Sequence, residues 1–383
     1  MLSKWLALGI LTLLVGIGYY LSYASAFGNK ASFAWLAGGV LGFTLQRSRF
    51  CFFCNFRDFW ERRDSGGLLA ILLALAVGLA GYHVVTGAWI VDPAAGHLPP
   101  KAHISPVGWH LVLGGFVFGL GMAISGSCIS AHLYRIGEGS LVCLFALLGL
   151  VPGFVIGYAF WNPVYLALIS NRPAIWIPAQ VGFFGALVLQ VLVLGALAFF
   201  IVRVLSDRGG KGGGAVVKAV FVDRWPWWVG GLIIGLLSTA MLLRIEPMGV
   251  TSEFSRLARW LGHGLGVLPE RLEGLDAVRG CGARPAEGFF SNGVLFIAAL
   301  ILASLGSAIA ANEFSLEWPR PIPALAAVFG GVLLGLGATW SFGCTIGTLL
   351  SGIHASALSG WVFGLCLMVG LLVGLPLRRR IIR

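Results

Sequence analysis

Gly114–Cys128 reads GGFVFGLGMAISGSC, and Gly330–Cys344 reads GGVLLGLGATWSFGC. The two stretches are identical at seven of fifteen positions without a gap, which indicates an internal repeat. Each stretch is an apolar run that breaks into small residues before a cysteine. We therefore predict two related halves, 1–205 and 225–383, joined by a flexible Gly-rich linker at 206–224.

The composition around these stretches is that of a membrane protein. The 383 residues are 58% hydrophobic and only 11% charged, with a mean hydropathy of +0.91. Soluble domains are near half apolar and a quarter charged, so a soluble fold is excluded. Apolar runs near the length that crosses a bilayer recur along the whole chain. The predicted spans are 5–22, 31–46, 66–85, 108–125, 141–161, 180–203, 226–242, 291–310, 324–340 and 356–376.

Paired GxxxG motifs predict how the two halves are oriented. The motif occurs in the second, fourth, seventh and ninth spans, as Gly38–Gly42, Gly115–Gly119, Gly231–Gly235 and Gly331–Gly335. One such motif alone indicates only close helix packing. Partner spans are five crossings apart, and an odd offset inverts orientation, as in many transporters. We predict an all-α, polytopic membrane helical bundle with inverted-topology internal repeats and short broken or re-entrant helices at its centre.

The basic residues predict the membrane topology. The net charge is +11, and clusters at 47–63, 203–224 and 378–383 all become cytoplasmic if the amino terminus is inside. The carboxyl terminus is then cytoplasmic too. The basic segment 243–290 falls on the other side, where we expect a folded excursion or short membrane-embedded helices. Ala24–Ala26 resembles a signal-peptidase site, although the preceding apolar run is longer than a usual signal core.

The chain breaks before the two repeat cysteines are candidates for a substrate site. Ser125–Cys128 and Ser341–Cys344 expose backbone groups that, at membrane depth, need protein or a water-filled cavity beside them. A short helix that restarts after each cysteine would direct free N–H groups at an anion. A single cysteine in an apolar helix is usually inert packing, as we expect for Cys143 and Cys366. The matched positions of the two repeat cysteines favour function instead.

A further pair of cysteines lies at the end of the second span. Cys51 and Cys54 belong to the aromatic and basic stretch Arg47–Asp58 (RSRFCFFCNFRD). Two cysteines three apart can be a redox pair, half of a metal site or unrelated thiols. No second CxxC and no paired histidine spacing accompany them, so no metal site is predicted. Cys51 could also be a third thiol on the path that the repeat cysteines define.

The thiols narrow the class of substrate. A thiol is a soft, weak hydrogen-bond donor and is poorly matched to sulfate or phosphate. Thiosulfate would offer its terminal sulfur to thiols and its oxygens to helix amides. No G-x-x-x-x-G-K-[ST] motif is present, so we expect an ion gradient or consumption of the substrate to drive transport. The sequence predicts a transporter for a small sulfur or selenium anion, with no enzymatic activity and no cofactor.

These motifs resemble the YeeE/YedE family of bacterial inner-membrane proteins, which includes thiosulfate transporters and proteins linked to selenium metabolism. The resemblance implies an inverted-repeat bundle in the inner membrane, with three thiols on the substrate path at Cys51, Cys128 and Cys344. The matching stretches are Arg49–Cys51, Phe56–Asp58, Gly114–Cys128, Tyr134–Arg135, Glu138–Gly139 and Gly343–Gly352.

The resemblance also implies supporting residues and partners. Gly126-Ser127 stands where the family has a glycine pair. Arg135 and Glu138, three apart, most simply form a local ion pair, although Arg135 can also attract an anion. The expected partners are the anion, the bilayer and a separate cytosolic sulfur carrier resembling TusA, with no nucleic acid. The residues expected to support the path are Gly126, Ser127, Gly343, Arg57 and Arg135.

Three other functions stay open at this point. The segment 243–290 resembles the selenium-associated branch of the family, which makes a selenium-compound transporter the nearest alternative. A membrane thiol–disulfide oxidoreductase that uses Cys51 and Cys54 is another, and it would need both thiols. A transporter should tolerate Cys54→Ala. A receptor or scaffold without flux is the third.

Overall fold

The structure is a computed structural model, and it describes residues 2–23, 28–205, 224–276, 278, 280 and 291–381. Within these ranges the chain is almost wholly helical and contains only isolated β-bridges in place of strands. The all-α prediction is therefore confirmed. Residues 206–223 of the Gly-rich linker, the Ala24–Ala26 site and Cys281 lie outside the described residues.

Ten long helices correspond to the ten predicted spans. Nine apolar stretches in the described part of the chain are long enough to cross a membrane. The tenth helix, α2, has 21 residues and is less apolar than the others. Most of its residues are buried, and it packs on neighbouring helices. The long helices are α1 (Leu2–Tyr23), α2 (Gly28–Ser48), α4 (Gly66–Trp89), α5 (Trp109–Ser125), α7 (Leu141–Ala159), α9 (Pro178–Leu205), α11 (Trp227–Arg244), α13 (Asn292–Ala310), α14 (Pro321–Trp340) and α16 (Leu358–Ile381).

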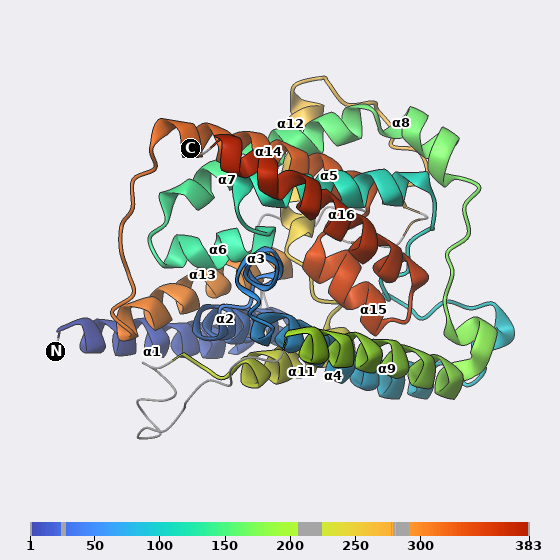
Figure 1. Cartoon of the computed structure of the whole chain (residues 1–383), viewed down its shortest axis with the longest axis horizontal. Coiled ribbons are helices and arrows are strands. Elements are labelled where there is room, and N and C mark those ends of the chain that lie inside the picture. Colours follow the sequence, from blue (N-terminus) through green and yellow to red (C-terminus); the bar gives the residue numbers. More distant parts are fainter. Residues whose placement is uncertain are drawn as a thin grey trace.

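The long helices form two groups with short helices between them (Figure 1). One group contains α1, α2, α4, α9, α11 and α13, and the other contains α5, α7, α14 and α16. Three of the short helices begin directly after a cysteine, at Cys51, Cys128 and Cys344. The short elements are α3 (Phe52–Arg62), η1 (Pro93–Ala95), α6 (Ile129–Gly137), α8 (Trp161–Val164), η2 (Tyr165–Ile169), α12 (Thr251–Gly264), η4 (Thr345–Ser351, π-helical) and α15 (Gly352–His354).

The most extensive packing joins helices from different halves of the sequence. α2 packs on α13, α4 on α11, α7 on α14 and α5 on α16. When each helix is exchanged for its predicted repeat partner, α2–α13 becomes α11–α4, and α7–α14 becomes α16–α5. The contacts therefore occur in pairs that two related halves would produce, and the internal repeat and its inversion stay predictions. The orientation of each half in the membrane and the division at 206–224 stay predictions.

The GxxxG motifs allow this close approach. Gly38 and Gly42 of α2 lie directly against the backbone carbonyls of Phe296 and Leu300 on α13. A Cβ atom at either glycine would overlap the carbonyl oxygen. Small residues at helix contacts are a main source of stability where lipid supplies no hydrophobic driving force. The interpretation of these motifs as packing contacts is confirmed.

The segment 243–290 contains one short helix among its described residues. α12 packs mainly on α7 and also touches α13 and α14. The described part of the segment is therefore folded, and both alternatives, an excursion outside the membrane and a short membrane-embedded helix, stay predictions.

Candidate functional site

The first repeat stretch breaks because Gly126 ends α5. Gly126 takes a left-handed conformation (φ 90°), and its N–H donates to the carbonyl of Met122. Glycine adopts this conformation without a steric penalty and is the usual residue after a helix end. The backbone becomes extended at Cys128, which is the N-terminal cap residue of α6.

The second repeat stretch breaks at the matching position with a different residue. Phe342 follows the end of α14 and is left-handed (φ 60°), a conformation that a bulky side chain rarely takes. Its buried ring makes edge contacts with the rings of His110 and Trp161, each at a centroid distance of 5.7 Å. Cys344 then precedes η4. Helical structure thus restarts directly after both repeat cysteines. That these short helices are re-entrant in the membrane stays a prediction.

Cys51 and Cys128 face each other across the space between the two helix groups. Cys51 caps α3, where its Sγ accepts from the N–H of Cys54 at 3.4 Å. The Sγ atoms of Cys51 and Cys128 are 4.0 Å apart, and Cys128 Sγ lies 3.3 Å from Ser130 Oγ. Both cysteines are fully buried. The structure therefore places side by side two thiols that are 77 residues apart in sequence.

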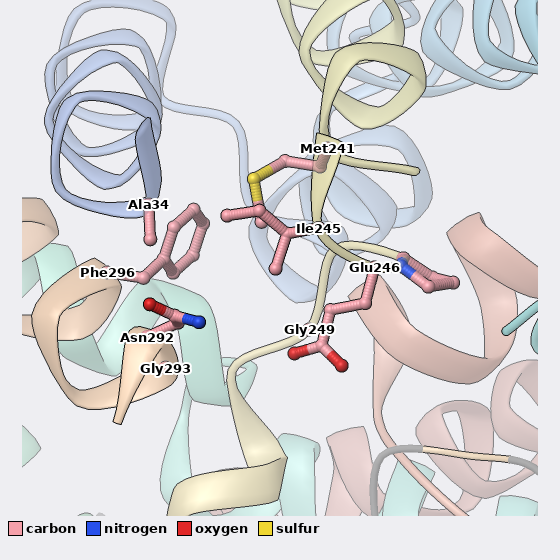
Figure 2. Close-up of a pocket in the computed structure, with 9 residues that line it drawn as sticks. Ala34, Met241, Ile245, Glu246, Gly249, Asn292, Gly293 and Phe296 are labelled. Atoms are coloured by element: carbon pink, nitrogen blue, oxygen red, sulfur yellow. The ribbon is translucent and has the colours of Figure 1, made fainter. Parts of the chain in front are cut away.

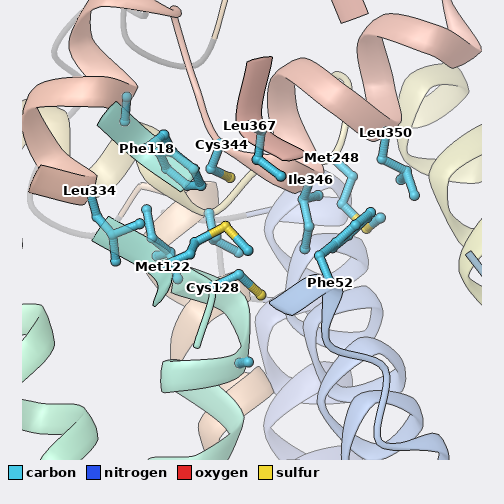
Figure 3. Close-up of a cluster of buried hydrophobic side chains, with 14 of the residues drawn as sticks. Phe52, Phe118, Met122, Cys128, Met248, Leu334, Cys344, Ile346, Leu350 and Leu367 are labelled. Atoms are coloured by element: carbon cyan, nitrogen blue, oxygen red, sulfur yellow. The ribbon is translucent and has the colours of Figure 1, made fainter. Parts of the chain in front are cut away.

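Cys344 belongs to the same extensive hydrophobic core, and we call the part of this core around the three cysteines the thiol cluster. Figure 3 shows Cys128 and Cys344 among apolar side chains from both halves of the chain. Cys54 is half-buried at the edge of this cluster, whereas Cys143 is buried but does not belong to it. The thiol cluster also includes Cys51, Phe52, Phe118, Met122, Met248, Leu334, Ile346, Leu350 and Leu367.

The thiol cluster is closed in this conformation. Each of Cys51, Cys128 and Cys344 is at most 1% exposed. A small pocket in Figure 2 lies elsewhere, between α2, α11 and α13, and no cysteine lines it. An anion can therefore reach the three thiols only after neighbouring side chains or helices move.

Arg135 contacts the break and not the carboxylate predicted as its partner. Its guanidinium donates to Ser127 Oγ at 3.1 Å and to Cys54 Sγ at 3.8 Å. The prediction of a local ion pair between Arg135 and Glu138 is therefore wrong. Glu138 instead forms an ion pair with Arg49 at 3.1 Å, because the end of α2 approaches the carboxylate.

The other two expected supporting residues have different surroundings. Arg57 forms an ion pair with Asp58 at 2.8 Å, and its guanidinium carbon lies 5.8 Å from the centre of the Phe53 ring. Gly343 is part of the second break, where its carbonyl accepts from the hydroxyl of Ser341 at 3.1 Å. Arg57 is therefore near Cys51, on α3, and Gly343 directly precedes Cys344.

A buried polar network that the sequence interpretation missed holds the loop before Cys51. Arg47 is fully buried, forms an ion pair with Glu313 at 2.9 Å and donates to Gln46 at 2.7 Å. Gln46 also accepts from Ser307 at 2.7 Å. The signal in the sequence was Gln46 at the last position of the predicted span 31–46, directly before Arg47, because polar groups at the end of a span need partners.

The charge of Glu313 fits this network. Partial burial alone would raise the pKa of its carboxyl, but the nearby charges of Arg49 and Arg47 outweigh burial and hold that pKa below its ordinary value. Glu313 is therefore ionised at neutral pH and attaches the end of α2 to the loop after α13.

A family model described as "Sulphur transport" matches residues 47–373. The chain belongs to this sulphur-transport family, the YeeE/YedE family. The match includes Cys51, Cys128 and Cys344, and it extends through both halves of the sequence.

Two relatives in the sulphur-transport family match nearly the whole chain. The thiosulfate transporter TsuA of Spirochaeta thermophila is 28% identical over 348 residues, which cover 88% of this chain and 95% of the relative. The thiosulfate transporter TsuA of Escherichia coli K12 is 25% identical, over 87% of this chain and 90% of the relative. The probable transporter YedE of Escherichia coli K12 is 29% identical over only 45% of this chain and 41% of its own length.

The distance between the Cys51 and Cys128 thiols predicts that an oxidant can cross-link them as a disulfide. A disulfide needs its sulfur atoms about 2.05 Å apart, so Cys51 and Cys128 must approach by about 2 Å. Diamide should take two electrons and two protons from this pair and become the hydrazine. Mass spectrometry of the digested protein should find a Cys51–Cys128 peptide pair that dithiothreitol removes. Cys143 and Cys366 should stay reduced, and a cross-link to either would contradict the geometry.

Proposed function

We propose that this chain imports thiosulfate, or a closely related small sulfur-containing anion, through a path lined by Cys51, Cys128 and Cys344. The observation that carries the proposal is the 4.0 Å approach of the Cys51 and Cys128 sulfur atoms in one buried cluster with Cys344. Membership of the sulphur-transport family and the names of the two long matches support the same substrate class.

The proposed path uses hydrogen bonds and not covalent intermediates. Thiols donate weakly and suit a soft terminal sulfur, while backbone N–H groups at the start of α6 suit the oxygens of the anion. Substrate handed between neighbouring thiols keeps its charge and oxidation state at every step. No reductant is then needed for each transport cycle.

The membrane setting of the proposal follows the charge pattern. The chain would lie in the bacterial inner membrane with its carboxyl terminus in the cytoplasm, as the basic clusters favour. A separate cytosolic sulfur carrier resembling TusA would receive the imported sulfur. The selenium-compound alternative keeps the same path and changes only the anion.

Uptake of radiolabelled thiosulfate tests the proposal. Cells that lack their own sulfate and thiosulfate importers should accumulate the label when they express the wild-type chain, and Cys344→Ala should remove this uptake at equal membrane levels. Unlabelled thiosulfate in excess should compete, whereas sulfate should not. Uptake that is absent from a well-inserted wild type, or a selenium anion that is transported while thiosulfate is not, would overturn the thiosulfate assignment.

Replacement of Cys54 distinguishes the transporter from the oxidoreductase alternative. Cys51 Sγ lies 4.0 Å from the thiol of Cys128, and it also accepts from the backbone N–H of Cys54, a contact that does not need the Cys54 side chain. Cys54→Ala should therefore leave thiosulfate uptake near the wild-type rate. Loss of uptake in this variant, with uptake kept in Cys128→Ala, would favour a Cys51–Cys54 dithiol.

A further inference from the structure

Three arginines from distant parts of the chain meet next to the break before Cys128. Arg135 comes from α6, Arg57 from α3 and Arg378 from the end of α16. Arg378 lies directly over Gly126, where an added Cβ would collide with its guanidinium, and it donates to the Ala123 carbonyl at 3.3 Å. A side chain at position 126 would therefore displace the Arg378 guanidinium from this place.

The three guanidinium groups share neighbours. Arg57 and Arg378 both lie over the ring of Phe53, with their guanidinium carbons 5.8 and 5.5 Å from its centre. Arg378 and Arg135 contact the two adjacent residues Gly126 and Ser127. The positive charges of Arg57 and Arg135 both act on Arg378. Like charges held this close repel one another unless an opposite charge joins them.

Among the described residues, one carboxylate forms an ion pair with one of these three guanidinium groups. Asp58 contacts Arg57 at 2.8 Å, and Glu61 contacts Arg379 at 2.8 Å. Arg135 and Arg378 form direct contacts there with a hydroxyl, a thiol, a carbonyl and an aromatic ring, while the charge of Glu61 acts on Arg378 and that of Glu138 on Arg135 without a direct ion pair. Both are half-buried, so water screens them less than it screens a surface arginine. In the described residues, two of the three guanidinium groups therefore have no carboxylate in direct contact, and both lie close to the break before Cys128.

We propose that Arg57, Arg135 and Arg378 form a binding site for a small divalent oxyanion at the mouth of the path on the side predicted to be cytoplasmic. Guanidinium groups bind oxyanions through paired N–H donors, which lysines cannot reproduce. The inference rests on the proposed function, because it gives the imported anion a second site after Cys128 and Cys51. The site would hold the oxygens of the anion while the thiols release its sulfur.

Equilibrium binding of thiosulfate to the purified full chain in detergent tests this site. Calorimetry should find that Arg378→Ala raises the Kd about tenfold or more, because a charged hydrogen-bond donor is lost. Arg378→Lys should recover part of the affinity. Arg380→Ala removes the same charge from an exposed position on the same helix and should bind like the wild type. Arg57→Ala is the second variant if Arg378→Ala does not fold, and it should weaken binding in the same direction.

The possible outcomes distinguish anion binding at this site from a purely structural role of Arg378. They also distinguish failure of this site from failure of the proposed function. If Arg378 only caps the Ala123 carbonyl, Arg378→Ala will lower the melting temperature without ligand and leave the Kd unchanged, which overturns the site. Thiosulfate binding that does not depend on the arginines supports the proposed function alone. Inorganic sulfate is the second probe: if the wild type binds sulfate but not thiosulfate, and binding depends on Arg378, the oxyanion site stands and the thiosulfate assignment fails. A wild type that binds neither anion overturns both.

Discussion

Cys128→Ala is expected to abolish thiosulfate uptake while the protein still inserts in the membrane. Cys128 is the thiol that contacts the Cys51 thiol at 4.0 Å and begins α6, so its loss removes the middle of the proposed path. The cost in stability should be small, about 1 kcal/mol, because one buried sulfur atom is removed and no charge is exposed. Radiolabelled uptake at matched membrane levels measures the effect.

Cys143→Ala is the matched control for this variant. Cys143 is equally buried, at 2% exposed, but it lies on α7 outside the thiol cluster. Its replacement removes the same sulfur atom from an apolar position. Equal loss of uptake in Cys128→Ala and Cys143→Ala would show a packing effect and would remove Cys128 from the path.

Arg47→Ala is expected to destabilise the fold by about 3 kcal/mol, because it removes a fully buried charged side chain together with its hydrogen bonds to Gln46 and Glu313, although Arg49 still pairs with Glu313. Arg47 is fully buried and attaches the end of α2 to Glu313, while Gln46 beside it would lose a donor. The loop that carries Cys51 begins two residues later. The thermal midpoint in detergent should fall, and uptake should fall with it.

Arg224→Ala tests how much an exposed ion pair with Glu313 contributes to stability, for comparison with the buried pair formed by Arg47. Arg224 approaches the same Glu313 carboxylate at 3.7 Å, but its side chain is 66% exposed. Ion pairs at the surface contribute about 0–1 kcal/mol, so this variant should melt close to the wild type. A drop as large as that of Arg47→Ala would show that the charge of Glu313, and not the burial of Arg47, determines stability.

The sequence predicted the fold well because span length and apolar composition are local properties. All ten spans coincide with long helices among the described residues, and the least apolar of them, α2, is the one with the most buried polar residues. The break at Gly126 was also readable from sequence, because glycine is common after a helix end. The matching break at Phe342 could not be predicted from the sequence. A phenylalanine with a left-handed backbone is rare, and its ring contacts here come from His110 and Trp161, which are distant in sequence.

The site was harder to predict because its contacts are long-range. The repeat pointed to Cys128 and Cys344, but the position of Cys51 beside Cys128 needed the family resemblance and the structure. Arg378 carried no signal of its own, since basic residues at a chain end are usual in cytoplasmic tails. Its contact with Gly126 joins residues more than 250 positions apart, and no local pattern encodes such a contact.

The packing of α2 against α13 has a consequence for how the protein is made. α2 is synthesised long before α13, so its glycine face meets only lipid, the insertion machinery or a chaperone until the second half arrives. A first half that ends at the Gly-rich linker would leave α2, α4 and α5 without the helices that cover them most. Such a fragment should be degraded when it is produced alone, and two separately produced halves should protect each other and assemble into one working unit.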